Sequence, residues 1–225
     1  YKDSLNQALT SAGYKNLSEY RQKMIKQIQY ANFLLDYIDD HFDDVFNDYY
    51  QQCAPKYVSL IKISVSDTSS PTDDETSKLN EVKELISNTD KSFGDIAQDY
   101  SNDSTSSKKG SLGIVDSKDT SGIANSYGKD VFNAIEALSE GQVSDVITGD
   151  NGYYFVKVTS TDKKTLKKEL KKTDIDSPLL AYDDYLQYVV YNSYKINYKD
   201  KDIKKIVQEV VNKALEERKT ERGEA

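Results

Sequence analysis

Apolar residues recur every three or four positions along residues 17–53, which predicts one long amphipathic helix. Ser18 is placed to cap its N-terminus, and Pro55 ends the helical stretch. The apolar stripe consists of Met24, Ile25, Ile28, Ala31, Leu35, Ile38 and Phe42. A stripe of this kind predicts packing against another element, because most helical stability in proteins comes from such packing.

The middle of the chain mixes the two-residue alternation of strands with short helical stretches. Residues 57–65, YVSLIKISV, alternate and are rich in β-branched types, which predicts a strand. The elements predicted after it are a helix around 79–86, a helix at 92–100, a short strand at 112–115, a helix around 131–138 and a hairpin of 142–148 with 153–159. Asn151–Gly152 supplies the hairpin turn. This order of elements predicts an α+β domain.

The last part of the chain returns to helical patterning. A lysine-rich connector covers 162–174, and Ser177–Pro178 begins a helix whose apolar face carries Tyr182, Tyr185, Leu186, Val189 and Val190. Residues 194–200 alternate like a short strand, and residues 203–215 form a final amphipathic helix. Neither end of the chain has much apolar surface alone. We therefore predict an N-terminal segment, 1–56, and a C-terminal segment, 162–225, that pack into one helical lobe around an inserted domain, 57–161.

Charge and cysteine usage exclude several classes of function. The net charge is −8 and the pI is near 4.8, which argues against a nucleic-acid partner, since phosphate binding needs a basic face. No apolar run approaches the length of a membrane span, and no signal peptide is present, an absence that leaves secretion open because a mature secreted protein has lost its own. The single cysteine, Cys53, excludes an internal disulfide, and the single histidine, His41, lies in an acidic stretch. The acidic runs 38–44 and 71–75 lack the spacing of a calcium loop, so neither a metal nor a cofactor is predicted.

Several motifs of the middle domain, taken in order, resemble those of parvulin-type peptidyl-prolyl cis–trans isomerases. They are FGDIAQDYSNDSTSSKKGSLG, beginning at Phe93, and ALSEGQVSDVITGDNGYYFVKV, beginning at Ala137. The resemblance covers roughly residues 57–161, and it implies a four-stranded antiparallel sheet with helices. The flanking segments resemble those of PrsA-type foldases, in which N- and C-terminal segments pack together around an inserted parvulin domain.

The resemblance implies a site at which an X–Pro bond is rotated without nucleophile or cofactor. Asp103 stands where bacterial parvulins carry an aspartate. The two family histidines correspond to Lys62 and Tyr154, and a family aspartate corresponds to Ser111. The pocket positions correspond to Tyr127, Val131 and Glu136, or to Ile135 if the register moves by one residue. The polar loop after Tyr100 overhangs the site in parvulins, and its Lys108 and Lys109 either hold substrate or only solvate the loop.

Three polar positions of this site differ from the family pattern, so the resemblance predicts the fold more strongly than the activity. The leading hypothesis is an extracytoplasmic foldase that binds unfolded or partly folded secreted polypeptides, with a parvulin-like domain of weak or absent isomerase activity. The alternatives are an active isomerase with a modified site of Lys62, Asp103 and Tyr154, and a scaffold for one specific partner. A lipidated cysteine upstream of Tyr1 would anchor such a lipoprotein to the outer face of a Gram-positive cytoplasmic membrane, and a homodimer is left open.

Overall fold

The computed structural model describes residues 2–170, 177–182, 187–188 and 195–223, and the chain divides into two compact units. One unit comprises residues 46–172, and the other combines residues 1–45 with residues 173–225. The boundaries expected from the sequence, 1–56, 57–161 and 162–225, concern which parts fold independently, and they stay a prediction.

The unit of residues 46–172 is built on a four-stranded antiparallel sheet in the order β2-β1-β4-β3. The strands are β1 (Lys56–Ser64), β2 (Ser111–Val115), β3 (Ile147–Gly149) and β4 (Gly152–Ser160). The two longest strands, β1 and β4, lie side by side at the centre of the sheet. This arrangement confirms the predicted α+β fold and its four-stranded antiparallel sheet.

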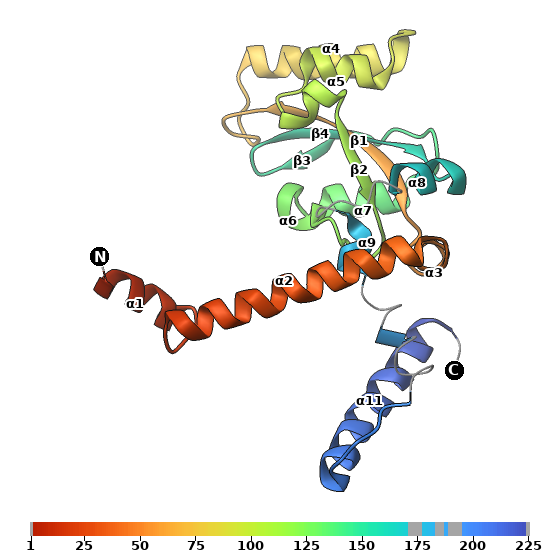
Figure 1. Cartoon of the computed structure of the whole chain (residues 1–225). Helices are drawn as coiled ribbons and strands as arrows, with labels where there is room; N and C mark the ends of the chain where they lie inside the picture. Colours follow the sequence, from red (N-terminus) through yellow and green to blue (C-terminus); the bar gives the residue numbers. More distant parts are fainter. Residues whose placement is uncertain (1, 171–176, 183–186, 189–194, 224–225) are drawn as a thin grey trace. The chain divides into compact units, whose positions relative to one another are not determined.

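Helices cover both faces of the sheet (Figure 1). On one face, Ile61, Ile63 and Phe155 belong to a core shared with helices α4 (Asp73–Asn88) and α5 (Phe93–Tyr100). On the other face, Leu60 and Val156 pack with α6 (Ile123–Tyr127) and α7 (Lys129–Ala137). The alternation of side chains along β1 and β4 therefore divides the core into two layers.

Local capping explains where the helices of this unit begin. Thr72 and Glu75 form a reciprocal capping box at the start of α4, and the Ser92 side chain accepts the N–H of Asp95 at the start of α5. The polar loop after α5 is ordered as well. It contains a short 3-10 helix, η1 (Ser104–Lys108), whose N-terminus is capped by Asp103.

Helix α3 (Phe42–Cys53) contributes its second half to the same unit. Phe46, Tyr49 and Cys53 are fully buried, and the Tyr49 hydroxyl donates to Oδ2 of the buried Asp116 at 2.7 Å. Burial and the nearby carboxylate raise the pKa of Tyr49. The lysine-rich stretch expected to be a connector contains helix α8 (Lys163–Leu170), in which Leu166 and Leu170 are buried one helical turn apart.

The other unit contains α1 (Lys2–Ser11), α2 (Leu17–Asp40), α9 (Pro178–Ala181) and α11 (Lys201–Glu221). The single helix predicted at 17–53 is interrupted at His41, so α2 and α3 are separate. The break stabilises the acidic run, because Asp43 and Asp44 then lie in the first turn of α3, where the helix dipole favours negative charge. The N-cap of α2 is Asn16, whose side chain accepts the N–H of Glu19, and not the predicted Ser18.

Apolar side chains of this second unit are only partly covered. On α2, Leu34 and Ile38 are buried, whereas Ile25 and Ile28 are exposed, and α11 has no buried residue. The strand predicted at 194–200 is wrong for 195–200, which form no strand, and Tyr194 lies outside the described residues. The predicted helical face of Tyr185, Leu186, Val189 and Val190 also lies outside them. Across the described ranges, no helix combines the length and the apolar character needed to cross a membrane.

Candidate active site

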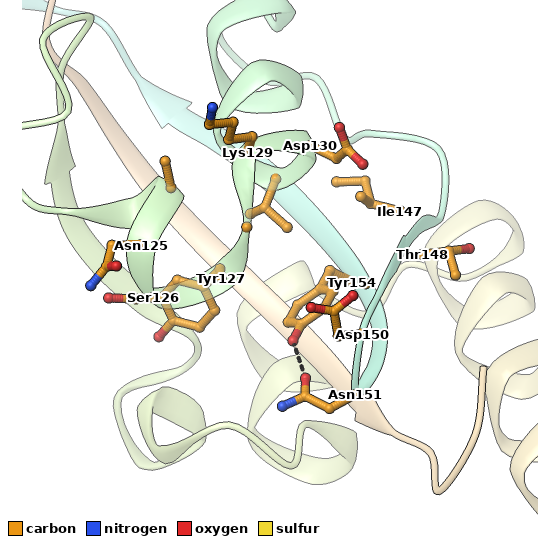
Figure 2. A pocket seen from close by; sticks show the side chains of 14 residues that line it. Asn125, Ser126, Tyr127, Lys129, Asp130, Ile147, Thr148, Asp150, Asn151 and Tyr154 are labelled. Atoms are coloured by element: carbon orange, nitrogen blue, oxygen red, sulfur yellow. Dashed lines mark hydrogen bonds between the residues drawn. The ribbon is translucent and has the colours of Figure 1, made fainter.

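A cleft with a volume of ≈ 420 Å³ lies between helices α6 and α7 and the β3–β4 hairpin. Figure 2 shows the side chains around it, with the rings of Tyr127 and Tyr154 facing the same space. Val131 and Ile147 add apolar surface, and the remaining lining is largely polar. The cleft therefore lies on the sheet face covered by α6 and α7.

Tyr154 reaches this cleft from the central strand β4. Its side chain is only 3% exposed and packs with the core residues around Leu60 and Val156. The hydroxyl donates to Oδ1 of Asn151 at 2.7 Å, the bond marked in Figure 2. Burial raises the pKa of Tyr154, and the carboxylates of Asp103 and Asp150 raise it further. The phenol is thus held neutral and already engaged in a hydrogen bond.

Tyr127 and Asp103 meet at the edge of the cleft. The Tyr127 hydroxyl donates to Oδ1 of Asp103 at 3.4 Å, a long hydrogen bond, and its ring stands edge-on to Tyr154 at 6.2 Å between centroids. Burial, followed by the Asp103 charge, raises the pKa of Tyr127 to about 12. The same Asp103 oxygen accepts bonds from the backbone N–H and the hydroxyl of Thr105. Asp103 is therefore occupied mainly in capping its own loop.

Lys62 joins this group from β1, where it lies directly opposite Tyr154 in the sheet register. Its Nζ stands 5.7 Å from the centroid of the Tyr154 ring, which is within the range of a cation–π contact. The backbone of Lys62 is also tied to the polar loop: its N–H donates to Ser101 Oγ, and its carbonyl accepts from the N–H of Asn102. These two bonds bring Asp103 close to the cleft.

The structure thus brings together Lys62, Asp103, Tyr127 and Tyr154, with Val131 in the cleft wall. It does not place the other predicted site residues there. Ile135 is fully buried in the core beside the cleft. Ser111, Lys108 and Lys109 line a separate groove on the opposite face of the sheet. A linear motif groups these residues in one site, but it does not show on which face of the sheet a strand residue such as Ser111 lies.

Glu136, which one alignment register puts in the proline pocket, lies away from the lining of the cleft. Its Oε1 stands 4.0 Å from Nζ of Lys56 and is buried without a hydrogen bond, and burial raises the pKa of Glu136. The ammonium of Lys56 donates to the carbonyls of Ile135, Glu136 and Leu138 at the end of α7. Lys56 thereby fixes the helix that carries Val131.

Sequence reasoning missed several polar groups of the cleft. Asn151 was interpreted only as a turn residue, yet it accepts the hydrogen bond of Tyr154. Asp150 and Thr148 line the cleft from the same hairpin. A turn motif carries no sign that its side chains face a site, because that depends on which helix packs opposite the hairpin.

The contact between Tyr127 and Asp103 predicts a shifted titration of the Tyr127 hydroxyl, which can be measured. The folded pKa of Tyr127, about 12, is above its ordinary value of 10.0, so its contribution to stability is complete below pH 10 and is lost as the pH rises toward 12. We expect ultraviolet titration to show a tyrosine component near pH 12 that Tyr127→Phe removes. Asp103→Asn should lower that pKa while the side chain keeps its size. A component unaffected by Tyr127→Phe would contradict the assignment.

Residues 60–160 match the family described as Rotamase, PPIC-type PPIase domain. Over 141 residues, 60% of the chain, the sequence is 32% identical to the foldase protein PrsA of Staphylococcus epidermidis and equally to that of Staphylococcus aureus. The matched part is 41% of each relative, so the chain spans less than half of their length. The crystal structure of PrsA from Bacillus subtilis is 22% identical, covers 89% of this chain and 77% of that one, and has a TM-score of 0.44.

Proposed function

Because residues 60–160 are a parvulin-type peptidyl-prolyl isomerase domain in a chain similar to PrsA foldases, we propose that the protein is an extracytoplasmic foldase. It binds unfolded or partly folded secreted polypeptides, and its parvulin domain has weak or absent isomerase activity. The family match supports the general function. The hydrogen bonds that the polar groups of the cleft make within the protein support the low activity.

Rotation of an X–Pro bond has a barrier of about 20 kcal/mol, which arises from amide resonance. A site lowers it by seating the proline ring on apolar surface and by directing polar groups at the twisted amide. Here the polar groups of the cleft are bonded to one another. Tyr154 donates to Asn151, and Asp103 accepts from Thr105 and Tyr127. The proposal of weak activity rests on this observation, because polar groups that are bonded to one another are not directed at a substrate amide.

The second candidate is an active isomerase with a modified site. The convergence of Lys62, Asp103, Tyr127 and Tyr154 at one cleft favours it, because a tyrosine hydroxyl and an ammonium can both donate to a carbonyl oxygen. Val131 and the two tyrosine rings offer the apolar surface that a proline ring needs. In this reading the hydrogen bonds among the polar groups rearrange when substrate binds.

A prolyl isomerisation assay on short peptides distinguishes the two candidates. We expect the full chain to be about 100-fold slower than a parvulin that has both histidines, which is the scale of a lost acid–base contribution. Lys62→His combined with Tyr154→His should then raise the rate. A wild-type rate equal to that of an ordinary parvulin, abolished by Asp103→Asn but kept by the exposed control Asp90→Asn, would establish the active enzyme instead.

Foldase activity has its own test, because it does not require isomerisation. The full chain should suppress the aggregation of several unrelated unfolded proteins at low molar excess. Protection of only one protein would favour the scaffold hypothesis. The extracytoplasmic location and a lipid anchor upstream of Tyr1 belong to the same proposal, and extraction of the native protein from membrane and medium fractions would locate it.

A further inference from the structure

A second concave surface lies across the sheet from the cleft, on the face that α4 and α5 cover only in part. It is a groove of ≈ 360 Å³ that continues from the N-terminus of α5 over β2, β1 and β4. Its principal lining residues are Tyr57, Ser59, Lys108, Lys109, Ser111 and Lys157. We call it the Ser59 groove. Ser59 and Lys157 point to the same face as Ile61 and Phe155, opposite to Tyr154.

The position of the Ser59 hydroxyl is the central observation for this groove. Its side chain lies in a cross-strand row, with Ser111 on one side in β2 and Lys157 on the other in β4. Ser59 is only 7% exposed, and among the described residues its hydroxyl has no hydrogen-bond partner, although its oxygen is not one of the fully buried unpaired atoms. By contrast, the hydroxyls of Tyr57 and Ser111 bond to each other at 2.8 Å. The Ser59 oxygen therefore keeps some contact with solvent, and its hydroxyl is available to a ligand that enters the groove.

The positive charge of the lysines in the groove indicates that the ligand is negatively charged. Lys109 is paired with Asp95 at 2.7 Å, but within the described ranges neither Lys108 nor Lys157 has a carboxylate partner. Two uncommitted ammonium groups thus face one groove on a chain whose net charge is −8. The N-terminus of α5 is already capped by the Ser92 side chain. The lysines and the hydroxyl, rather than the helix end, therefore provide the attraction for a negatively charged group.

We propose that the Ser59 groove binds an acidic segment of a polypeptide. A carboxylate of that segment accepts a hydrogen bond from Ser59 and is held by Lys108 and Lys157, while Tyr57 and Phe93 contact the aliphatic part of the segment. A polypeptide fits better than a small free anion because the groove extends across three strands and has aromatic walls. The groove and the cleft lie on opposite faces of the sheet, so both sites can be occupied together.

The proposal deepens the foldase function, on which it rests. It names one surface that holds a polypeptide, and that surface depends neither on proline nor on the cleft. The test uses the full chain and a fluorescein-labelled ten-residue peptide of Glu, Ala and Tyr without proline, with a peptide carrying Gln for Glu as reference. Fluorescence anisotropy at low salt should give at least about tenfold tighter binding of the acidic peptide, because charge attraction is weakly screened there. Added salt should remove most of the difference.

Variants then locate the binding. Lys108→Gln with Lys157→Gln should weaken binding by about tenfold, and Ser59→Ala also by about tenfold, the scales of two exposed ion pairs and of one hydrogen bond to a charged group. Lys83→Gln with Lys118→Gln removes the same charge at exposed positions outside the groove and should change binding by less than about twofold.

Three results would overturn the proposal. The acidic and Gln peptides could bind equally, or the control pair could weaken binding as much as the groove pair. Inorganic phosphate could also displace the peptide far better than chloride does at equal ionic strength, which would make the groove a small-anion site. Circular dichroism of each variant verifies that it is folded. Because the peptide contains no proline, its failure to bind leaves the isomerisation and aggregation assays unaffected.

Discussion

Residues 57–161 expressed alone are expected to be less stable than residues 46–172 by about 5 kcal/mol or more. The shorter segment lacks Phe46, Tyr49 and Cys53, all fully buried, and it also lacks Leu166 and Leu170. Removal of one buried phenylalanine side chain alone costs about 3–5 kcal/mol. Urea unfolding followed by circular dichroism measures the difference, and the longer segment should melt in one cooperative transition.

A buried hydrogen bond adds to this difference. Asp116 accepts from Tyr49 and from the hydroxyl of Thr120, and without α3 its carboxylate would lose the Tyr49 bond inside the core. Tyr49→Phe should therefore cost about 1.5–3 kcal/mol, the range for hydrogen bonds to charged groups. Tyr50→Phe is the matched control, because the hydroxyl of Tyr50 donates to a carbonyl, that of Thr161. This substitution should cost about 1 kcal/mol.

For the comparison of residues 57–161 with residues 46–172, equal stability of the two segments would show that α3 is not part of this folding unit.

Gly110→Ala should be among the most destabilising single substitutions in the chain. Gly110 has a φ of +76°, where a side chain is strained. Its N–H donates to the Thr105 carbonyl within the polar loop, and its carbonyl accepts the N–H of Leu60 in β1. A Cβ at this position would lie 2.8 Å from the Cβ of Ala97 and closer still to the carbonyl oxygen of Leu60. Neither neighbour can move without disturbing α5 or the centre of the sheet.

The control for this substitution lies three residues further along. Gly113 has a similar φ of +80°, but nothing lies within 4 Å of a Cβ built on it. Gly113→Ala should cost about 1–2 kcal/mol through backbone strain alone. Gly110→Ala should cost about 3 kcal/mol more than that, because the crowding adds to the strain. Equal losses in a thermal or urea melt would mean that the loop moves away from β1 at little cost.

The sequence by itself determined the type and order of the main elements in the middle of the chain. Alternation marks β1 and β4, Ser92 marks the start of α5, and Asn151–Gly152 marks the turn between β3 and β4. These signals are local, since capping, turn geometry and side-chain period depend on neighbouring residues. They were sufficient for the α+β class, whereas the four-stranded antiparallel sheet was expected from the resemblance to parvulins.

Local signals were weaker where the partner surface lies far away in the sequence. The stripe at 17–53 predicts a helix but not the interruption at His41. The many lysines of 162–174 indicated a connector and not the helix α8. Its Leu166 and Leu170 are buried through tertiary packing, which the local sequence does not show. Likewise, a pattern of apolar residues does not reveal that Ile203, Ile206 and Val210 are exposed on α11, because exposure depends on what packs against the helix.

Only the tertiary structure decided how the polar residues are distributed between the two faces of the sheet. Asp103 and Ser111 are close in the sequence, yet Asp103 bonds Tyr127 at the cleft while Ser111 lies beside Ser59 on the opposite face. The face on which a strand residue lies depends on the register with its neighbours, and β2 contains a register shift against β1. Such a shift is a long-range property of strand pairing, and it divides residues that a linear motif groups together.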